Sequence, residues 1–376
     1  MHRSRSSVCK TLSILGAAVA SLIVVGESSP TSPSAAFQRI AMTTATTGWA
    51  LTATEIYRTT NAGRRWQHTG PSLLHSSAVY WQVASSTEVW VSVVDAHTAR
   101  LYYTSDGGRR WTSSQLPTPP SAFLSDITFI HPSTGFALYV VDLTPSNEKA
   151  EVFATQNRGK SWRRENNPLP LAGIKSGISV SPNRAIWLAG GSVATGHIYL
   201  YRQVNPRSPW QSVLIRVNHA LKGSILWSSP PIFFNQRDGI LPVFINGTGG
   251  DPIFYATHNG GLSFRPTAAV VPIGQASTAS VSQWGFTTMK TGWALVTENG
   301  ANGLDADAPT LYETNDGGMH WTALSTRPAL SAIGLLDMLT NQVGFATPPI
   351  GPGLLKVTVK PRSPSHPAKT LATRHG

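Results

Sequence analysis

The sequence predicts an all-β chain folded as a ring of seven four-stranded antiparallel sheets, on three observations. One turn pattern occurs five times, and one short apolar strand pattern occurs seven times at intervals of 41 to 53 residues. The 33 glycines and 27 prolines favour many turns over long helices. Four short strands repeated every 40–50 residues or so are typical of a β-propeller blade, so we expect a single propeller with seven blades.

The first 36 residues are expected to be an export signal or an N-terminal membrane anchor. Three basic residues precede an apolar run from Thr11 to Gly26, and small residues around Ala35 offer a cleavage site before Phe37. Either form would place the protein outside the cytoplasm, secreted or in the cell envelope. The single cysteine, Cys9, lies in this segment, so the rest of the chain can form no disulfide and no thiolate metal site.

Each repeat then begins with an apolar strand, followed by a second apolar strand that often starts with glycine. The central residues of the seven second strands are Trp49, Trp90, Phe136, Trp187, Ile240, Trp293 and Phe345. Their spacings are 41, 46, 51, 53, 53 and 52 residues. We therefore expect one blade for each copy, within a propeller that spans residues 37–359.

A third strand leads in five of the repeats into the turn pattern Thr-x-(Asn/Asp)-x-Gly-x-x-(Trp/Phe). The copies are Thr59, Asn61, Gly63 and Trp66; Thr104, Asp106, Gly108 and Trp111; Thr155, Asn157, Gly159 and Trp162; Thr257, Asn259, Gly261 and Phe264; and Thr314, Asp316, Gly318 and Trp321. The Asn or Asp side chain can accept backbone N–H groups across its own turn, with Thr joining by its hydroxyl. We expect these residues to stabilise the blades, with the aromatic ring packed between neighbouring sheets.

One copy of the turn is missing from the series. The third and fourth copies are 102 residues apart, which is twice the period of 51, so a degenerate copy is expected near residue 208. The strand before it and Trp210 are expected to survive without the acidic turn.

Closure of the ring is harder to predict. No turn motif and no fourth strand follow the seventh copy, so we expect either imperfect closure or a seventh blade of three strands. Pro30 and Pro33 make residues 27–36 a poor source of the missing strand. A six-bladed ring with an additional C-terminal sheet is the alternative. Residues 360–376 contain no acidic residue and no apolar period, and we expect a disordered basic tail.

The turn pattern resembles the Asp-box, or BNR repeat, of Asp-box β-propellers, over nearly the whole chain from Phe37 to Val359. Proteins with this repeat include sialidases, xyloglucan-cleaving glycoside hydrolases, sortilin-type receptors and photosystem II stability/assembly factors. The regular alternation of the Gly-Trp-Ala strand with the turn is most similar to the last group and its exported bacterial relatives. The resemblance implies the fold, and it leaves the function open between these groups.

Hydrolytic chemistry finds little support in the sequence. The resemblance to sialidases would imply an arginine triad and an Arg-Ile-Pro segment, but the chain reads Arg39-Ile40-Ala41 at that place. A glycoside hydrolase needs two carboxylates that face each other across the substrate, and no such pair stands out. The eleven histidines are scattered without ligand spacing, so we expect no metal, no cofactor and no catalytic residue.

The formal net charge of +12 favours an anionic partner. Arginine pairs near the turns of the first three blades could form a basic arc for such a partner: Arg64, Arg65, Arg109, Arg110, Arg163 and Arg164. A generally basic surface without a specific partner is the other interpretation. We expect an exported, monomeric, non-catalytic scaffold that binds a protein or an anionic envelope polymer, with no nucleic-acid partner and membrane contact only through an uncleaved N-terminus. The alternative function is a sialidase-like or other glycoside hydrolase.

Overall fold

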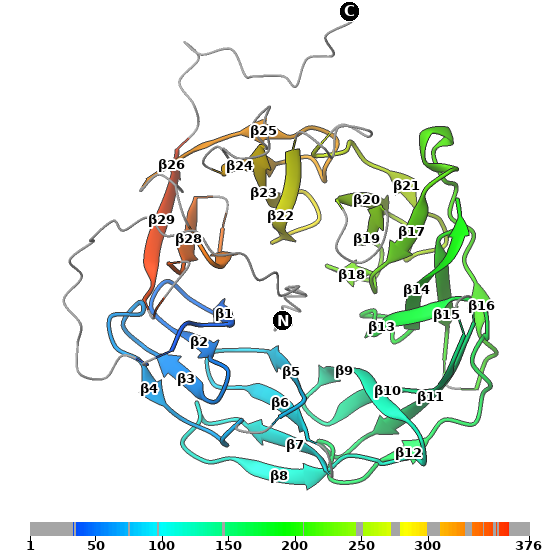
Figure 1. Cartoon of the computed structure of the whole chain (residues 1–376), viewed down its shortest axis with the longest axis horizontal. Coiled ribbons are helices and arrows are strands. Elements are labelled where there is room, and N and C mark those ends of the chain that lie inside the picture. The colour runs from blue at the N-terminus through cyan, green and yellow to red at the C-terminus, as the bar shows by residue number, and fades with distance from the viewer. Residues whose placement is uncertain are drawn as a thin grey trace, which may run out of the picture.

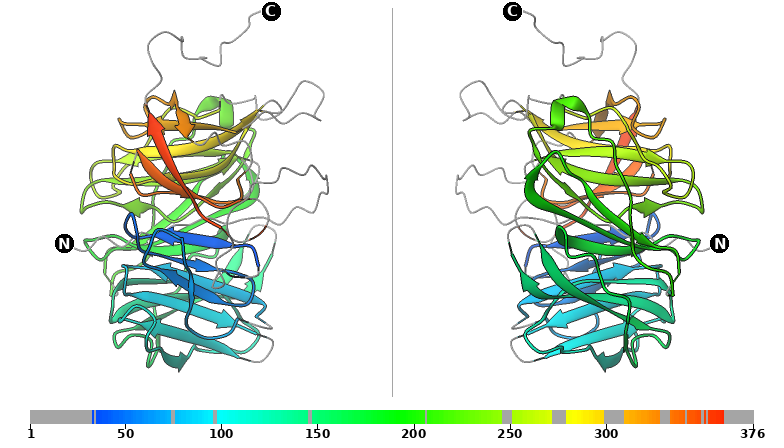
Figure 2. Two further views of the ribbon diagram at one scale, coloured as in Figure 1. Left: turned by 90° about the vertical axis from the view of Figure 1, so that its left-hand side faces the viewer. Right: turned by 90° about the vertical axis from the view of Figure 1, so that its right-hand side faces the viewer.

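The computed structural model describes residues 33, 35–73, 76–95, 98–144, 147–205, 207–245, 251–271, 279–298, 309–327, 333–340, 342–348, 351 and 353–360. Almost all of the expected export segment, including Cys9, lies outside the described residues, as does the basic tail after Lys360. Viewed down its short axis, the described chain is a ring of sheets that follow one another in chain order (Figure 1). Viewed from the side, the ring is a thick disc (Figure 2).

The first three blades are separate four-stranded antiparallel sheets. Blade 1 contains β1 (Arg39–Met42), β2 (Gly48–Leu51), β3 (Ile56–Thr59) and β4 (Gln67–His68). Blade 2 contains β5 (Ala78–Val83), β6 (Val89–Val94), β7 (Ala99–Thr104) and β8 (Thr112–Gln115). Blade 3 contains β9 (Phe123–His131), β10 (Thr134–Leu143), β11 (Glu148–Thr155) and β12 (Arg163–Arg164).

Blades 4 and 5 are joined into one nine-stranded sheet. Blade 4 contains β13 (Ile174–Val180), β14 (Ile186–Thr195), β15 (Tyr199–Gln203) and β16 (Gln211–Ser212). Blade 5 contains β17 (Ile225–Ser228), β18 (Ile232–Phe233), β19 (Gly239–Ile245), β20 (Pro252–Thr257) and β21 (Arg265–Pro266). Pro230 and Pro231 split the inner strand of blade 5 into β17 and β18, because proline cannot donate to the ladder. The freed strand β17 pairs with both β14 and β19.

Blade 6 is again a simple sheet, and blade 7 corrects the expectation about closure. Blade 6 contains β22 (Ala279–Phe286), β23 (Gly292–Glu298), β24 (Thr310–Thr314) and β25 (Thr322–Ala323). Blade 7 contains β26 (Ser325–Arg327), β27 (Leu336–Met338), β28 (Val343–Ala346) and β29 (Leu355–Lys360), in the spatial order β27-β28-β29-β26. Its fourth strand thus exists, but it precedes the other three in the chain. The described residues form seven blades, as predicted, and not six with an extra sheet.

The predicted strand centres form the core of every blade. All seven central residues of the second strands are at most 9% exposed, and Trp49, Trp187, Ile240 and Phe345 are completely buried. Burial of large aromatic and aliphatic side chains is the main stabilising contribution in such a fold. Apart from the strands, the described residues include one short 3₁₀ helix, η1 (His219–Leu221). No helix within the described part of the chain is long and apolar enough to span a membrane.

Candidate functional site

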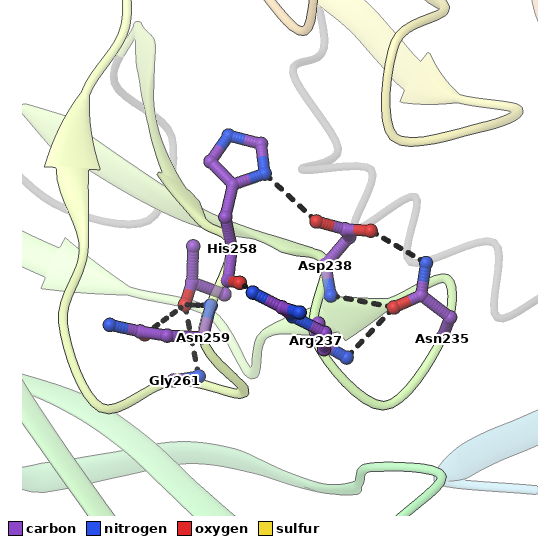
Figure 3. A network of polar contacts seen from close by, with 7 residues as sticks. Asn235, Arg237, Asp238, His258, Asn259 and Gly261 are labelled. Carbon is purple, nitrogen blue, oxygen red and sulfur yellow. Dashed lines mark hydrogen bonds and ion pairs between the residues drawn. The ribbon is translucent and has the colours of Figure 1, made fainter.

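The five motif turns have the same hydrogen bonds. In blade 5 the Thr257 hydroxyl donates to Asn259 Oδ1 at 3.0 Å and accepts the Gly261 N–H at 2.9 Å (Figure 3). Asn259 Oδ1 also accepts the N–H of Ser263 at 3.0 Å. All five threonines are only 1% exposed. This geometry is that of a self-contained turn, as predicted, and it uses the polar groups of the motif internally.

Each motif turn is also tied to the loop between the inner and second strands of its own blade, called here the inner loop. In blades 5 and 6 the Gly260 and Gly317 N–H groups donate to the carbonyls of Arg237 and Lys290, both at 2.8 Å. The equivalent bonds in blades 1 to 3 join Ala62 to Thr46, Gly107 to Thr87 and Arg158 to Ser133. The motif turns and inner loops therefore lie on one face of the ring, and the turns fix the loops.

The motif aromatic residues pack across to the preceding blade. Trp111 of blade 2 meets Trp49 of blade 1 with ring centroids 6.3 Å apart, and Phe264 of blade 5 meets Trp187 of blade 4 at 6.1 Å. The Trp111 Nε1–H also donates to the Thr69 hydroxyl of blade 1 at 3.2 Å. These contacts bear out the expectation that the motif aromatic ring packs between neighbouring sheets.

Blade 4 contains the degenerate copy of the turn, and it keeps more than the sequence analysis expected. Gln203 takes the place of the threonine at the end of the third strand, and Trp210 takes that of the tryptophan. Asn205 stands at the motif position, where its Oδ1 accepts the N–H groups of Arg207 at 3.0 Å and Ser208 at 3.1 Å. The motif glycine is replaced by Arg207, so this turn presents a cation instead.

A central channel of about 2930 Å³ opens on the face that carries the inner loops. Its wall is formed by the inner strands and their loops, with many Ser and Thr side chains. Five exposed cations line it: Arg163, Arg184, Arg207, Arg237 and Lys290. Arg163 is paired there with Glu165. The channel mouth is thus polar and basic on the side of blades 4 to 6.

Three of these cations occupy the same position in consecutive repeats. Arg184, Arg237 and Lys290 each stand three residues before the central residue of the second strand, and they are spaced by 53 and 53 residues. The corresponding residues elsewhere are uncharged: Thr46, Thr87, Ser133 and Gln342. We call Arg184, Arg237 and Lys290 the basic crescent. Sequence reasoning missed it, although aligning the repeats on their second strands would have found it.

Arg237 is held in position by a network from two loops of blade 5 (Figure 3). Its Nε–H donates to the His258 carbonyl at 3.3 Å, and its backbone N–H donates to Asn235 Oδ1 at 2.8 Å. Asp238 Oδ1 pairs with His258 Nδ1 at 2.8 Å. Side-chain hydrogen bonds lower the pKa of the Asp238 carboxyl below its ordinary value, with the larger effect from Asn235 and the smaller from His258. His258 thus pairs with the carboxylate of Asp238, the residue that follows Arg237 in the chain.

All six arginines of the predicted basic arc are described, and they fall into two groups: four in motif turns and two in a strand with ion pairs. Arg64, Arg65, Arg109 and Arg110 are exposed on the motif turns of blades 1 and 2. The blade 3 pair instead forms strand β12. There Arg163 pairs with Glu165 at 2.9 Å and Arg164 with Glu151 at 2.6 Å.

Carboxylates are few at the channel. Of the described residues that line it, Glu165 on blade 3 and Asp337 on blade 7 are acidic. Glu165 pairs with Arg163, and Asp337 Oδ2 accepts the Met42 N–H at 2.6 Å. Within the described chain, no group of three His, Cys, Asp or Glu side chains could hold a metal ion.

Comparison with known proteins supports the fold. The sequence matches no protein-family model and no curated protein. The solved structure of YCF48 bound to a D1 peptide is similar, with a TM-score of 0.53 and 16% identity over 88% of this chain and 93% of that chain. The chain is a β-propeller. At this identity the likeness concerns the fold alone.

Two further solved structures are similar at lower TM-scores. YCF48 from Cyanidioschyzon merolae has a TM-score of 0.45 and 15% identity, over 88% of this chain and 97% of that one. The Hadza microbial sialidase Hz136 has a TM-score of 0.43 and 11% identity, over 82% of this chain and 73% of that one. A fold does not by itself decide the chemistry of a protein.

Proposed function

We propose that the protein is an exported, non-catalytic propeller of the Asp-box type, related to photosystem II assembly factors, that binds an anionic segment of a protein partner at the cell envelope. The observation that carries this proposal is the basic crescent. Three cations at one repeat position line the mouth of a wide channel, on inner loops that have no catalytic pair beside them among the described residues.

The geometry suits an extended anionic segment better than a small substrate. The channel is far larger than a typical small-molecule site of roughly 300–1,000 Å³. Loops on a rigid scaffold commonly carry binding, and here the motif turns fix the inner loops of blades 5 and 6 by backbone hydrogen bonds. The similar propeller YCF48 binds a D1 peptide, which makes a peptide ligand a reasonable class for this chain.

The proposal is tested by capturing partners with the tagged full-length protein from solubilised envelope of its own host, at low and at moderate salt. A discrete protein that stays bound at moderate salt supports the scaffold, because exposed charge attraction alone is screened. If only anionic polymer is captured, and only at low salt, the charge acts without a specific partner. A parallel screen for glycan hydrolysis decides the alternative: turnover would replace the scaffold by a hydrolase.

A further inference from the structure

Four exposed apolar side chains gather on blades 3 and 4, away from the basic crescent. Phe123, Leu143, Leu171 and Val193 are 58%, 52%, 61% and 57% exposed. We call them the apolar patch. Exposed apolar side chains are ordinary when scattered, but a contiguous group marks a surface that meets something apolar.

Strand pairing places Phe123, Leu143 and Leu171 together. Phe123 begins β9 opposite Val140 of β10, and Leu143 ends β10 three residues further on. Leu143 lies opposite Glu148, whose N–H donates to the Leu171 carbonyl at 2.9 Å. The three side chains thus occupy adjacent backbone segments at one edge of blade 3.

Val193 lies at the same edge of blade 4. It follows Gly191 on β14 by two residues, and Gly191 pairs with Ile174 at the start of β13. Inner strands begin and second strands end at this edge, so it is the face of the ring opposite the inner loops. The second strands β10 and β14 have ten residues each, whereas those of the other blades have four to seven. Leu143 and Val193 lie in the last residues of these two long strands.

A buried lysine holds the loop that exposes Leu171. Lys175 is 4% exposed, and its Nζ donates to the carbonyls of Leu171 and Ala172, both at 3.2 Å, and of Gly173 at 2.8 Å. The Glu148 carbonyl lies 3.3 Å from the same Nζ, so four carbonyl oxygens share its three N–H donors. Burying an ammonium group is costly unless its hydrogen bonds are satisfied, and here they fix three consecutive residues of the loop. The exposure of Leu171 therefore belongs to a firmly held structure.

The chain itself indicates what this face meets. All inner strands run in the same direction, so β1 also begins on this face, and the segment before Phe37 joins the ring there. That segment contains the apolar run 11–26 behind three basic residues. Such a sequence enters membranes, and where it is retained it would hold this face towards the bilayer.

The charges beside the patch are compatible with an anionic membrane surface. Asp142 and Lys149 lie opposite each other in the β10–β11 register, and both are exposed. Lys222 is exposed next to the end of β14, where its carbonyl meets Gly196. These neighbours are one exposed carboxylate and two exposed lysines, so a net positive charge lies beside the apolar side chains, on a chain of charge +12. Apolar side chains next to net positive charge suit a surface of anionic lipid.

We propose that the apolar patch rests on an anionic lipid bilayer, with Phe123, Leu143, Leu171 and Val193 inserted among the headgroups and the basic crescent facing away. This adds a second membrane contact to the one expected from the N-terminus. The proposed lipid contact and the proposed function both place the protein at the cell envelope, and they have no other premise in common.

The test places a fluorescent probe at single positions of the full-length chain. In a Cys9→Ser background, Leu143→Cys and Leu171→Cys are labelled with an environment-sensitive dye, and Leu262→Cys provides the control. Leu262 is 66% exposed in a motif turn on the other face. Each protein is mixed with phosphatidylcholine–phosphatidylglycerol vesicles containing a lipid-borne quencher, or with phosphatidylcholine vesicles alone.

The proposal predicts a blue shift and loss of most fluorescence at positions 143 and 171, stronger with phosphatidylglycerol, and neither change at position 262. It is overturned if the probe at 171 remains as water-exposed as the probe at 262 on vesicle-bound protein. A blue shift at 171 without vesicles, growing with protein concentration, also overturns it and assigns the patch to a second copy of the chain. Partner capture is measured separately on the same labelled proteins. Loss of lipid contact by the apolar patch can therefore be distinguished from loss of partner binding by the basic crescent.

Discussion

The Asp337 carboxylate accepts the backbone N–H of Met42 at 2.6 Å, across 295 residues of sequence. This bond joins β27 and β1, the inner strands of blade 7 and blade 1, which contact each other where the ring closes. Figure 1 shows blades 7 and 1 as neighbours in the ring. The same kind of contact joins other neighbours: Gln82 to Phe129, Asp126 to Ile178 and Gln283 to Leu336. The ring is thus closed by the kind of side-chain contact that is used between other blades, and among the described strands none is exchanged between its two ends.

Replacing Asp337 by alanine is expected to lower the free energy of unfolding by about 1–3 kcal/mol, because the Met42 N–H loses its charged acceptor. Urea unfolding measures this. Asp337→Asn keeps an acceptor oxygen and should retain most of the stability. Equal losses in both variants would show that the charge, and not the acceptor, matters.

The motif threonines are expected to contribute stability through their hydroxyls. Thr257→Val keeps the shape but removes one donor and one acceptor, so about 1–3 kcal/mol of the free energy of unfolding should be lost. Thr195→Val, at an exposed strand end, serves as the control and should change little. A Thr257→Val protein as stable as the control would contradict the structural role of the motif.

Glu148 and Lys175 are expected to give the protein a stability minimum between about pH 7 and pH 8. Burial raises the pKa of Glu148 to about 7, against the partial compensation of Lys175, and burial lowers the pKa of Lys175 to about 8. The stability from protonated Glu148 is complete below its unfolded pKa and is lost as the pH rises through 7. The stability from neutral Lys175 is complete above its unfolded pKa and is lost as the pH falls through 8.

Unfolding measured from pH 5 to pH 8 tests this expectation. At about 1.4 kcal/mol per pKa unit, the wild-type protein should lose on the order of 3 kcal/mol across this range through Glu148. Glu148→Gln should flatten the profile, whereas the exposed Asp142→Asn should leave it unchanged. A wild-type profile that already lacks this slope would refute the assignment.

Much of the fold was predictable because the repeat is local. The motif turns satisfy their own polar groups, and the second strands bury their central residues, so both leave strong sequence patterns. Strand β26 has no recognisable sequence pattern. It pairs with β29, about thirty residues later in the chain, and it directly follows β25 of the previous blade. Non-local pairing of so short a strand cannot be recognised from composition or periodicity.

The candidate site was predicted less well. The predicted arc relied on arginine doublets, and the doublet of blade 3 proves to be a strand in ion pairs with Glu165 and Glu151. The basic crescent consists of single cations of two residue types, set in loops of different sequence. A search for arginine doublets overlooks them, whereas an alignment of the repeats on their second strands places all three at one position.

The most direct test of the proposed function compares two triple variants that remove the same charge. Arg184→Ala/Arg237→Ala/Lys290→Ala removes the crescent, and Arg64→Ala/Arg65→Ala/Arg109→Ala removes part of the predicted arc. The measurement is the affinity of each variant for the partner captured from the envelope, at moderate salt. At roughly 0.5–1 kcal/mol for each exposed charge contact, the crescent variant should bind at least about ten-fold more weakly, and the arc variant should bind like the wild type. Equal weakening in both variants, or weakening in the arc variant alone, would contradict a specific role for the crescent.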